Sequence, residues 1–297
     1  MKRIISLIGV LFIIFLLYGV VEEYNIVDRF INVKEDKIIE KNNNNLEIYF
    51  FDVGEGDSIL IRKNNKNVLI DGGNNKDGKY LVEYLKELNI DSFQYIIATH
   101  PHEDHIGGLD YVIRDFNIDN YYELDIQLDN MTYLDIVNET NKKNIIRQVP
   151  KIDEEFNVDD LLFKILYLDN NYEDINNSSM IIRLVYKNTS YLFMSDANKE
   201  EEQLILDKDI KSDVLKVGHH GSQYSTSAQL INKVKPRYSI ISCGLNNDYG
   251  FPKQVTLEKL ERINSKIYRT DQDHTIKLIS DGDNINIETI KTNINHE

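Results

Sequence analysis

Cysteine is almost absent from this chain: Cys243 is the single one among 297 residues. One thiol excludes an intramolecular disulfide and any metal site built from several thiolates. Cys243 lies in the apolar run of residues 238–243, so the sequence predicts a small buried hydrophobic side chain at this position. A metal site in this chain would draw on imidazole and carboxylate ligands.

Positive charge is also scarce. Lys and Arg number 34 against 49 Asp and Glu, which gives a net charge of −15 at pH 7. Proteins that bind DNA irrespective of its sequence use a basic surface to neutralise the phosphates. The composition therefore argues against tight duplex DNA binding and against a processive nuclease. It leaves small or short anionic substrates open, because a bound metal ion supplies a local positive field.

Long apolar runs are limited to one, the uncharged residues 4–21 that follow Lys2 and Arg3. Its length lies between that of a spanning helix and that of a signal-peptide core. Because no clear A-x-A-type cleavage site follows, residues 1–21 are predicted to be an uncleaved signal anchor, with a cleaved signal peptide as the alternative. The basic flank would stay in the cytoplasm and place the rest of the chain outside. The polar residues 22–46 predict a linker, and residues 47–297 predict the folded domain.

The densest chemical signal is the run His100-Pro101-His102-Glu103-Asp104-His105, followed by Gly107 and Gly108. Imidazole and carboxylate side chains suit Zn²⁺ and similar divalent ions. His100 and His102, two residues apart in an extended turn, can point in one direction. Asp104 and His105 begin the next element and point toward a neighbouring site. The spacing predicts the two-metal layout of a hydrolase, on a loop between a strand and a helix.

From residue 47 onward, strand-like and helix-like patterns alternate. Strands are expected over 46–51, 57–62, 67–70, 93–98, 161–168, 179–186, 190–194, 214–217, 238–243, 275–280 and 284–290, and helices over 78–88, 200–206, 228–234 and 255–263. Residues 110–160 show only weaker helices and loops. The last two strands would form a hairpin about residues 281–283.

Seven motifs in order give this chain its resemblance to a known family. They are the histidine cluster and residues 51–58, 69–73, 177–184, 193–196, 215–222 and 246–252. The chain resembles metallo-β-lactamase-fold hydrolases, whose signature is HxHxDH. More narrowly, it is similar to the extracytoplasmic hydrolase domain of the ComEC competence-protein family and its stand-alone relatives. The resemblance implies an α/β fold, the αββα four-layer sandwich.

The resemblance also assigns roles outside the histidine cluster. Asp196 matches the carboxylate that bridges two metals. In the following pair, we predict His219 as a metal ligand and His220 as a side chain that orients the substrate or the leaving group. Asp71 matches the aspartate that fixes a metal-binding imidazole. Asp57 either acts likewise or stabilises its turn.

Three polar residues, Ser222, Asn247 and Tyr249, lie on loops where the site should open. Each of them either hydrogen-bonds a substrate phosphate or is an ordinary polar residue of its loop without a role in binding.

The complete prediction for the site is one or two divalent ions, Zn²⁺ or Mn²⁺, with Asp104 and His220 as catalytic residues. The predicted metal ligands are His100, His102, Asp104, His105, Asp196 and His219.

Two departures from the resemblance concern histidine. Many relatives place a further histidine between the first cluster and the bridging aspartate, but this chain has none between His105 and His219. Its first metal site would then be completed by water or by an oxygen ligand, which makes Mn²⁺ as suitable as Zn²⁺. Relatives also often carry histidine where this chain has Phe251, which predicts a change in specificity or a lower phosphodiesterase activity.

The leading functional prediction is an extracytoplasmic metal-dependent hydrolase of phosphodiesters, with nucleic acid or an envelope polymer as substrate. A phosphorylcholine-esterase-like activity on teichoic acids is the alternative within the enzymes, because the same ligands would serve both. The alternative from another class is a non-catalytic, membrane-tethered binding protein that retains the fold. The missing histidine and Phe251 favour this last alternative, while the intact HxHxDH signature argues against it.

Overall fold

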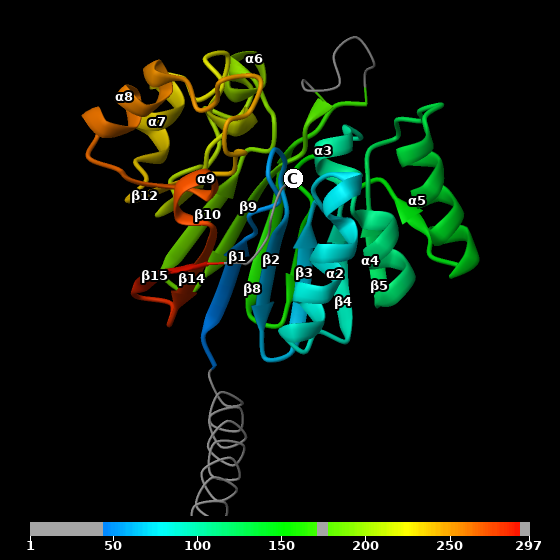
Figure 1. Ribbon diagram of the computed structural model, residues 1–297. Coiled ribbons are helices and arrows are strands. Elements are labelled where there is room, and N and C mark those ends of the chain that lie inside the picture. Colours follow the sequence, from blue (N-terminus) through cyan, green and yellow to red (C-terminus); the bar gives the residue numbers. More distant parts are fainter. Residues whose placement is uncertain (1–43, 171–177, 292–297) are drawn as a thin grey trace, which may run out of the picture. The chain divides into compact units, whose positions relative to one another are not determined.

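The computed structural model describes residues 44–170 and 178–291, whose arrangement is shown in Figure 1. The predicted signal anchor and nearly all of the predicted linker lie outside the described residues. Within the described residues, no helix has both the length and the apolar character needed to cross a membrane. The described residues from Asn45 onward form one compact unit.

Two sheets form the centre of this unit. The first has the strand order β15 (Ile285–Ile290), β14 (Thr275–Ser280), β1 (Leu46–Phe50), β2 (Ile59–Lys63), β3 (Lys66–Ile70), β4 (Ser92–Ile97), β5 (Asn117–Tyr122) and β6 (Arg147–Gln148). The second has the order β13 (Lys266–Arg269), β12 (Tyr238–Ile241), β11 (Val214–Lys216), β10 (Thr189–Phe193), β9 (Ile181–Tyr186), β8 (Leu161–Tyr167) and β7 (Glu155–Val158).

Helices cover the outer face of each sheet (Figure 1). The first sheet carries α2 (Gly78–Glu87), α4 (Leu109–Asp115) and α5 (Met131–Lys142). The second carries α7 (Ala228–Val234) and α8 (Gln254–Arg262). The helix α6 (Lys199–Gln203) lies in the connection between β10 and β11. The short helices η2 (Asn75–Asp77), α3 (Glu103–Ile106), η4 (His219–Gly221) and α9 (Thr270–Asp273) lie in the connections. The predicted αββα sandwich is confirmed for the described residues.

The central strands are apolar on both faces because each sheet is covered on both sides. In β1, the side chains of Leu46, Ile48 and Phe50 enter the core between the two sheets. Their neighbours Tyr49 and Phe51 point the other way and pack beneath the helices. Because successive side chains point to opposite faces and both faces are buried, such strands appear in the sequence as nearly continuous apolar runs.

The region 110–160 is where the sequence prediction was least complete. It holds the strands β5, β6 and β7 as well as the helices α4 and α5, and β13 was also missed. In β5 only the last two residues are buried, so the strand has neither the apolar run nor the strict alternation of the central strands.

The predicted hairpin of β14 and β15 is confirmed. Cys243 is buried under the second sheet, as predicted.

A buried ion pair joins the two sheets at one edge. Lys216, at the end of β11, is fully buried, and its Nζ lies 2.8 Å from Oδ2 of Asp57, in the loop between β1 and β2. Lys216 Nζ also donates a hydrogen bond to the carbonyl oxygen of Val217, at 3.1 Å. Removing one partner of such a pair leaves an uncompensated charge in the protein interior.

We therefore predict that Lys216→Met lowers the free energy of unfolding by about 3–5 kcal/mol, the usual cost of breaking a buried pair. Lys86→Met is the matched control, because the Lys86–Asp115 pair is exposed and should contribute less than about 1 kcal/mol. Urea unfolding of the full-length chain followed by circular dichroism measures both. Adding Asp57→Leu to Lys216→Met should recover part of the loss. Equal effects of the Lys216 and Lys86 substitutions would contradict the prediction.

Candidate metal centre

The predicted site residues come from loops at one edge of the two sheets. Asp71 follows β3, the histidine cluster follows β4, Asp196 follows β10, and the pair His219 and His220 follows β11. β3 is parallel to β4, and β10 is parallel to β11, so each pair of strands ends on the same side. The carboxyl edge of parallel strands is where α/β proteins place their ligands.

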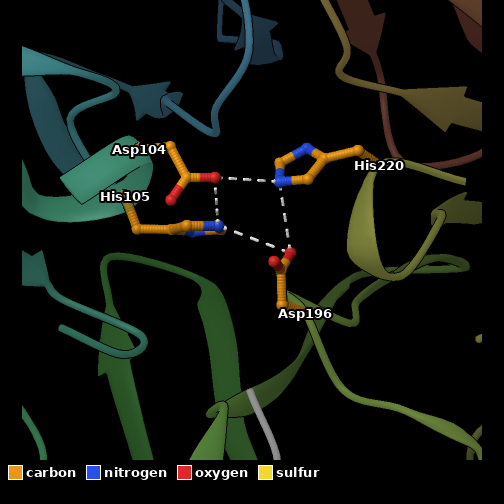
Figure 2. Close-up of side chains that lie close together, drawn as sticks. All are labelled: Asp104, His105, Asp196 and His220. Carbon is orange, nitrogen blue, oxygen red and sulfur yellow. Dashed lines mark ion pairs between the residues drawn. The ribbon is translucent and has the colours of Figure 1, made fainter. Parts of the chain in front are cut away.

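Four side chains from both halves of the fold converge there: Asp104, His105, Asp196 and His220 (Figure 2). Oδ1 of Asp196 lies 3.4 Å from Nε2 of His105 and 3.4 Å from Nε2 of His220. On the opposite side, Oδ2 of Asp104 lies 3.3 Å from Nε2 of His220 and 3.7 Å from Nε2 of His105. His105, Asp196 and His220 are buried.

Three of the converging atoms are buried without a hydrogen bond to any described residue: Nε2 of His105, Nε2 of His220 and Oδ1 of Asp196. A buried polar atom without a partner costs free energy. The atoms that face one another are the ligand atoms that Zn²⁺ and Mn²⁺ accept from proteins. A divalent ion between them would satisfy all three, so the residues present fit a metal.

The electrostatics of this cluster follow from two aspartates facing two imidazoles. Burial lowers the pKa of an imidazole, but the carboxylate of Asp196 and its acidic neighbours raise the pKa of His105 well above its usual value and that of His220 to about 10. Burial would raise the pKa of Asp104 and Asp196, yet the facing imidazoles keep both well below the usual range. Without a metal, the facing carboxylates therefore favour the protonated form of both imidazoles.

A second group consists of His100, His102 and Asp196. Nε2 of His100 lies 3.1 Å from Nδ1 of His102 and 4.0 Å from Oδ2 of Asp196. Asp196 thus presents one carboxylate oxygen to each group, as expected for the carboxylate of a two-metal site. Nε2 of His219 lies 3.8 Å from the same Oδ2, and its Nδ1 lies 3.2 Å from Oδ1 of Asn198.

The structure distinguishes the two histidines of the pair. His220 belongs to the four-residue cluster, whereas the sequence favoured His219 as the ligand and His220 as the orienting side chain. Nδ1 of His220 lies 3.0 Å from the carbonyl oxygen of Ser242, which fixes the imidazole with Nε2 toward Asp104 and Asp196. The role of His219 as a ligand stays a prediction.

Side chains behind the ligands hold them in place. Oδ2 of Asp71 lies 2.8 Å from Nδ1 of His105, which is the contact expected from the sequence. The hydroxyl of Thr99 lies 2.7 Å from the same carboxylate oxygen and 2.7 Å from the hydroxyl of Ser195. Both hydroxyls lie 3.2 Å from Nδ1 of His100. One hydrogen-bonded network therefore orients a ligand of each group.

The sequence analysis assigned no role to several of these supporting residues: Thr99, Ser195, Asn198, Lys216 and Ser242. Ser195 and Lys216 lie within the motifs 193–196 and 215–222, and Thr99 and Ser195 each directly precede a predicted ligand, which are the signals that could have identified them. Asp57 lies 3.8 Å from Nδ1 of His220, but its shorter contact is with Lys216.

The predicted substrate-binding residues have different environments. Ser222 is buried, and its hydroxyl accepts a hydrogen bond from the backbone N–H of Tyr224. The Asn247 side chain makes three hydrogen bonds within its own loop, to Gly244 and Phe251. Tyr249 is 64% exposed. Of the three, Tyr249 alone presents most of its side chain to solvent.

Fold and site agree with the family match: the chain belongs to the metallo-beta-lactamase superfamily, which it matches over residues 51–245. It is 28% identical over 252 residues to the ComE operon protein 3 of Bacillus subtilis, covering 78% of this chain and 32% of that protein. It is 29% identical to the recombination protein 2 of Haemophilus influenzae, covering 81% of this chain and 30% of that protein. The chain thus spans about a third of the length of these relatives.

A solved structure supports the fold alone. The metallo-beta-lactamase fold protein YhfI of Bacillus subtilis superposes with a TM-score of 0.51 at 10% identity, covering 75% of this chain and 95% of that one. The predicted resemblance to the competence proteins is confirmed by the curated relatives, which include the competence protein ComA of Neisseria gonorrhoeae, 24% identical over 77% of this chain and 31% of that protein.

Metal binding should release protons, because both imidazoles of the four-residue cluster have raised pKa values and have to deprotonate to act as ligands. We predict that the chelator-treated chain releases about two protons per ion bound in this cluster at pH 7, and that affinity weakens as the pH falls. Calorimetric titration with Zn²⁺ or Mn²⁺ in buffers of different ionisation enthalpy measures the release. His220→Ala should reduce it by about one proton. A heat that does not depend on the buffer would contradict the prediction.

Proposed function

We propose that this protein is a metal-dependent hydrolase of phosphodiesters. The observation that carries the proposal is the convergence of Asp104, His105, Asp196 and His220, with three buried ligand atoms that make no hydrogen bond within the described residues. When bound, one or two divalent ions would activate water as the nucleophile and neutralise charge on the phosphate oxygens. The nitrogen and oxygen ligands suit Zn²⁺ or Mn²⁺.

The residues of the chain itself would orient the metal ligands, close the four-residue cluster and contact the substrate. His105 and His220 are held by Asp71 and by the Ser242 carbonyl, which fixes the orientation of both rings. Asp104 is 28% exposed, so it closes the four-residue cluster on its more accessible side. His219 is 20% exposed beside the second group, where its imidazole would contact either an ion or the substrate.

The substrate is proposed to be a short or small phosphodiester from nucleic acid or from an envelope polymer. The names of the relatives refer to competence and recombination, which favours nucleic acid among the phosphodiesters. The net charge of −15 argues against tight binding of duplex DNA. A phosphorylcholine-esterase-like activity remains the alternative enzyme. The alternative without catalysis, a binding protein that keeps the fold, would need no turnover at this site.

Hydrolysis of bis-p-nitrophenyl phosphate by the full-length chain, with and without added Mn²⁺ or Zn²⁺, tests the proposal. We predict turnover that a chelator abolishes and that Asp104→Ala lowers by more than about a hundredfold, since partners that only orient a ligand already cost 10–100-fold. Asp129→Ala is the control, because Asp129 is an exposed loop aspartate. Wild-type rates in the Asp104 variant, or bound metal without any turnover, would contradict a catalytic role.

We further propose that the folded domain lies outside the cytoplasm, attached to the membrane through residues 1–21. The support is the basic pair Lys2 and Arg3 followed by the uncharged run 4–21. Protease added to intact protoplasts should release or degrade the domain while a cytoplasmic marker protein stays intact. Protection of the domain in intact protoplasts, together with its recovery in the soluble fraction after lysis, would contradict this location.

A further inference from the structure

A column of aromatic rings extends outward from the candidate metal centre. Phe251 packs against both imidazoles of the histidine pair, with ring centroids 6.4 Å from His220 and 5.8 Å from His219. Its plane is tilted by 26° from that of His220. The ring of Tyr249 stacks on Phe251 at 5.5 Å, with an angle of 13° between the planes. Tyr249 therefore lies one further ring beyond a predicted metal ligand.

The loop that carries this column is held at several points. The side chain of Asn247 accepts a hydrogen bond from the backbone N–H of Phe251 and donates two, to the carbonyl oxygens of Gly244 and Phe251. The backbone N–H of Lys253 donates to the carbonyl oxygen of Gly221, in the turn of the histidine pair, at 2.9 Å. The Lys253 ammonium lies 5.5 Å from the centroid of Phe251. The loop is thus fastened to the turn that supplies His220.

Tyr249 nevertheless remains 64% exposed, and Leu245 of the same loop is 71% exposed. A tyrosine loses little conformational entropy on contact, and one already stacked on a neighbouring ring loses less. Aromatic side chains that project from a fixed loop beside a nucleic-acid site commonly stack on bases, because every base has a flat face. Offset stacking on Phe251 holds the Tyr249 ring in the orientation that such a contact needs.

We propose that Tyr249, supported by Phe251, is a substrate-specificity residue that stacks on a planar ring of the substrate, such as a nucleobase in a single strand. This inference rests on the proposed phosphodiesterase function. Because Tyr249 stacks on Phe251, which in turn packs against His220, the stacked group belongs to a unit next to the scissile phosphate rather than to that phosphate. The ring face of Tyr249, and not the hydroxyl hydrogen bond considered from the sequence, provides the contact.

We call the stacked rings of Tyr249 and Phe251 the stacking platform. Two matched substrates test its role. One is a short single-stranded oligonucleotide, and the other has the same sugar-phosphate backbone and length but no bases. Both carry the same charge and the same kind of scissile bond. For the wild-type full-length chain we expect a KM about tenfold lower for the strand with bases, a typical effect of stacking one base. Tyr249→Ala should remove most of this difference between the two strands, and kcat should change less than KM.

Two further variants separate the effect of the ring from that of the hydroxyl and from that of an exposed tyrosine in general. Tyr249→Phe keeps the ring and removes the hydroxyl, so it should retain the wild-type KM ratio of the two strands. Tyr224→Ala removes a tyrosine with the same 64% exposure that has no stacking partner among the described residues, and it should leave the ratio and the activity unchanged. If Tyr249→Phe loses as much as Tyr249→Ala, the hydroxyl is responsible and the platform is wrong.

The platform and the proposed function can fail separately. If the wild type hydrolyses bis-p-nitrophenyl phosphate but shows equal KM values for the two strands, the platform is wrong and the hydrolase stands. A lower KM for poly(glycerol phosphate) than for the strand with bases would also overturn the platform. If no phosphodiester is hydrolysed, the proposed function is wrong. In that case, fluorescence anisotropy of the two labelled strands tests the platform. The platform requires that the wild type binds the strand with bases more tightly than the strand without them, and that Tyr249→Ala abolishes this difference in affinity.

Discussion

The compensation of buried negative charge is the constraint on which this fold and its site depend. Asp57, Asp71 and Asp196 are each at most 2% exposed, and all three lie in loops that follow strands of the two sheets. A buried carboxylate is tolerated only with partners that offset its loss of hydration. Asp57 has the ammonium of Lys216, and Asp71 has His105 and Thr99. Asp196 has the imidazoles of His105 and His220, which can either carry protons or lose them and bind a cation together with Asp196.

Each of these compensations joins parts of the chain that are distant in sequence. The Asp57–Lys216 pair connects the first sheet to the second, and Asp196 faces His105 across the same junction. The two halves of the sandwich therefore cannot separate without leaving charge unpaired in the interior. A metal ion in the four-residue cluster would strengthen the same junction, since it would draw ligands from both halves. Stability and metal binding are linked through these side chains.

Much of this was predictable because it is encoded locally. The HxHxDH run places four predicted ligands within six residues, and the central strands appear as apolar runs because both of their faces are buried. The supporting contacts were not predictable in this way. Lys216 contacts Asp57 from the other half of the chain, and Ser195 contacts Thr99 across 96 positions of sequence. Neither residue type signals such a partner by itself. The strand β5 and the edge strand β6 were missed because their burial follows no clear period.

The backbone shows where the fold accepts strain for the site. Asp71, Ser195, His219 and His220 all have positive φ angles, of 59°, 48°, 48° and 51°. The left-handed region costs a residue with a side chain roughly 1–2 kcal/mol. Such residues persist where the surroundings over-determine them, and they cluster at functional sites. At the histidine pair, two consecutive left-handed residues turn the chain so that His220 faces Oδ1 of Asp196 while His219 faces Oδ2. A pair of adjacent imidazoles can thereby reach both sides of one carboxylate, which neither a strand nor a regular helix would allow. The strain at the histidine pair is therefore explained by the geometry of the site.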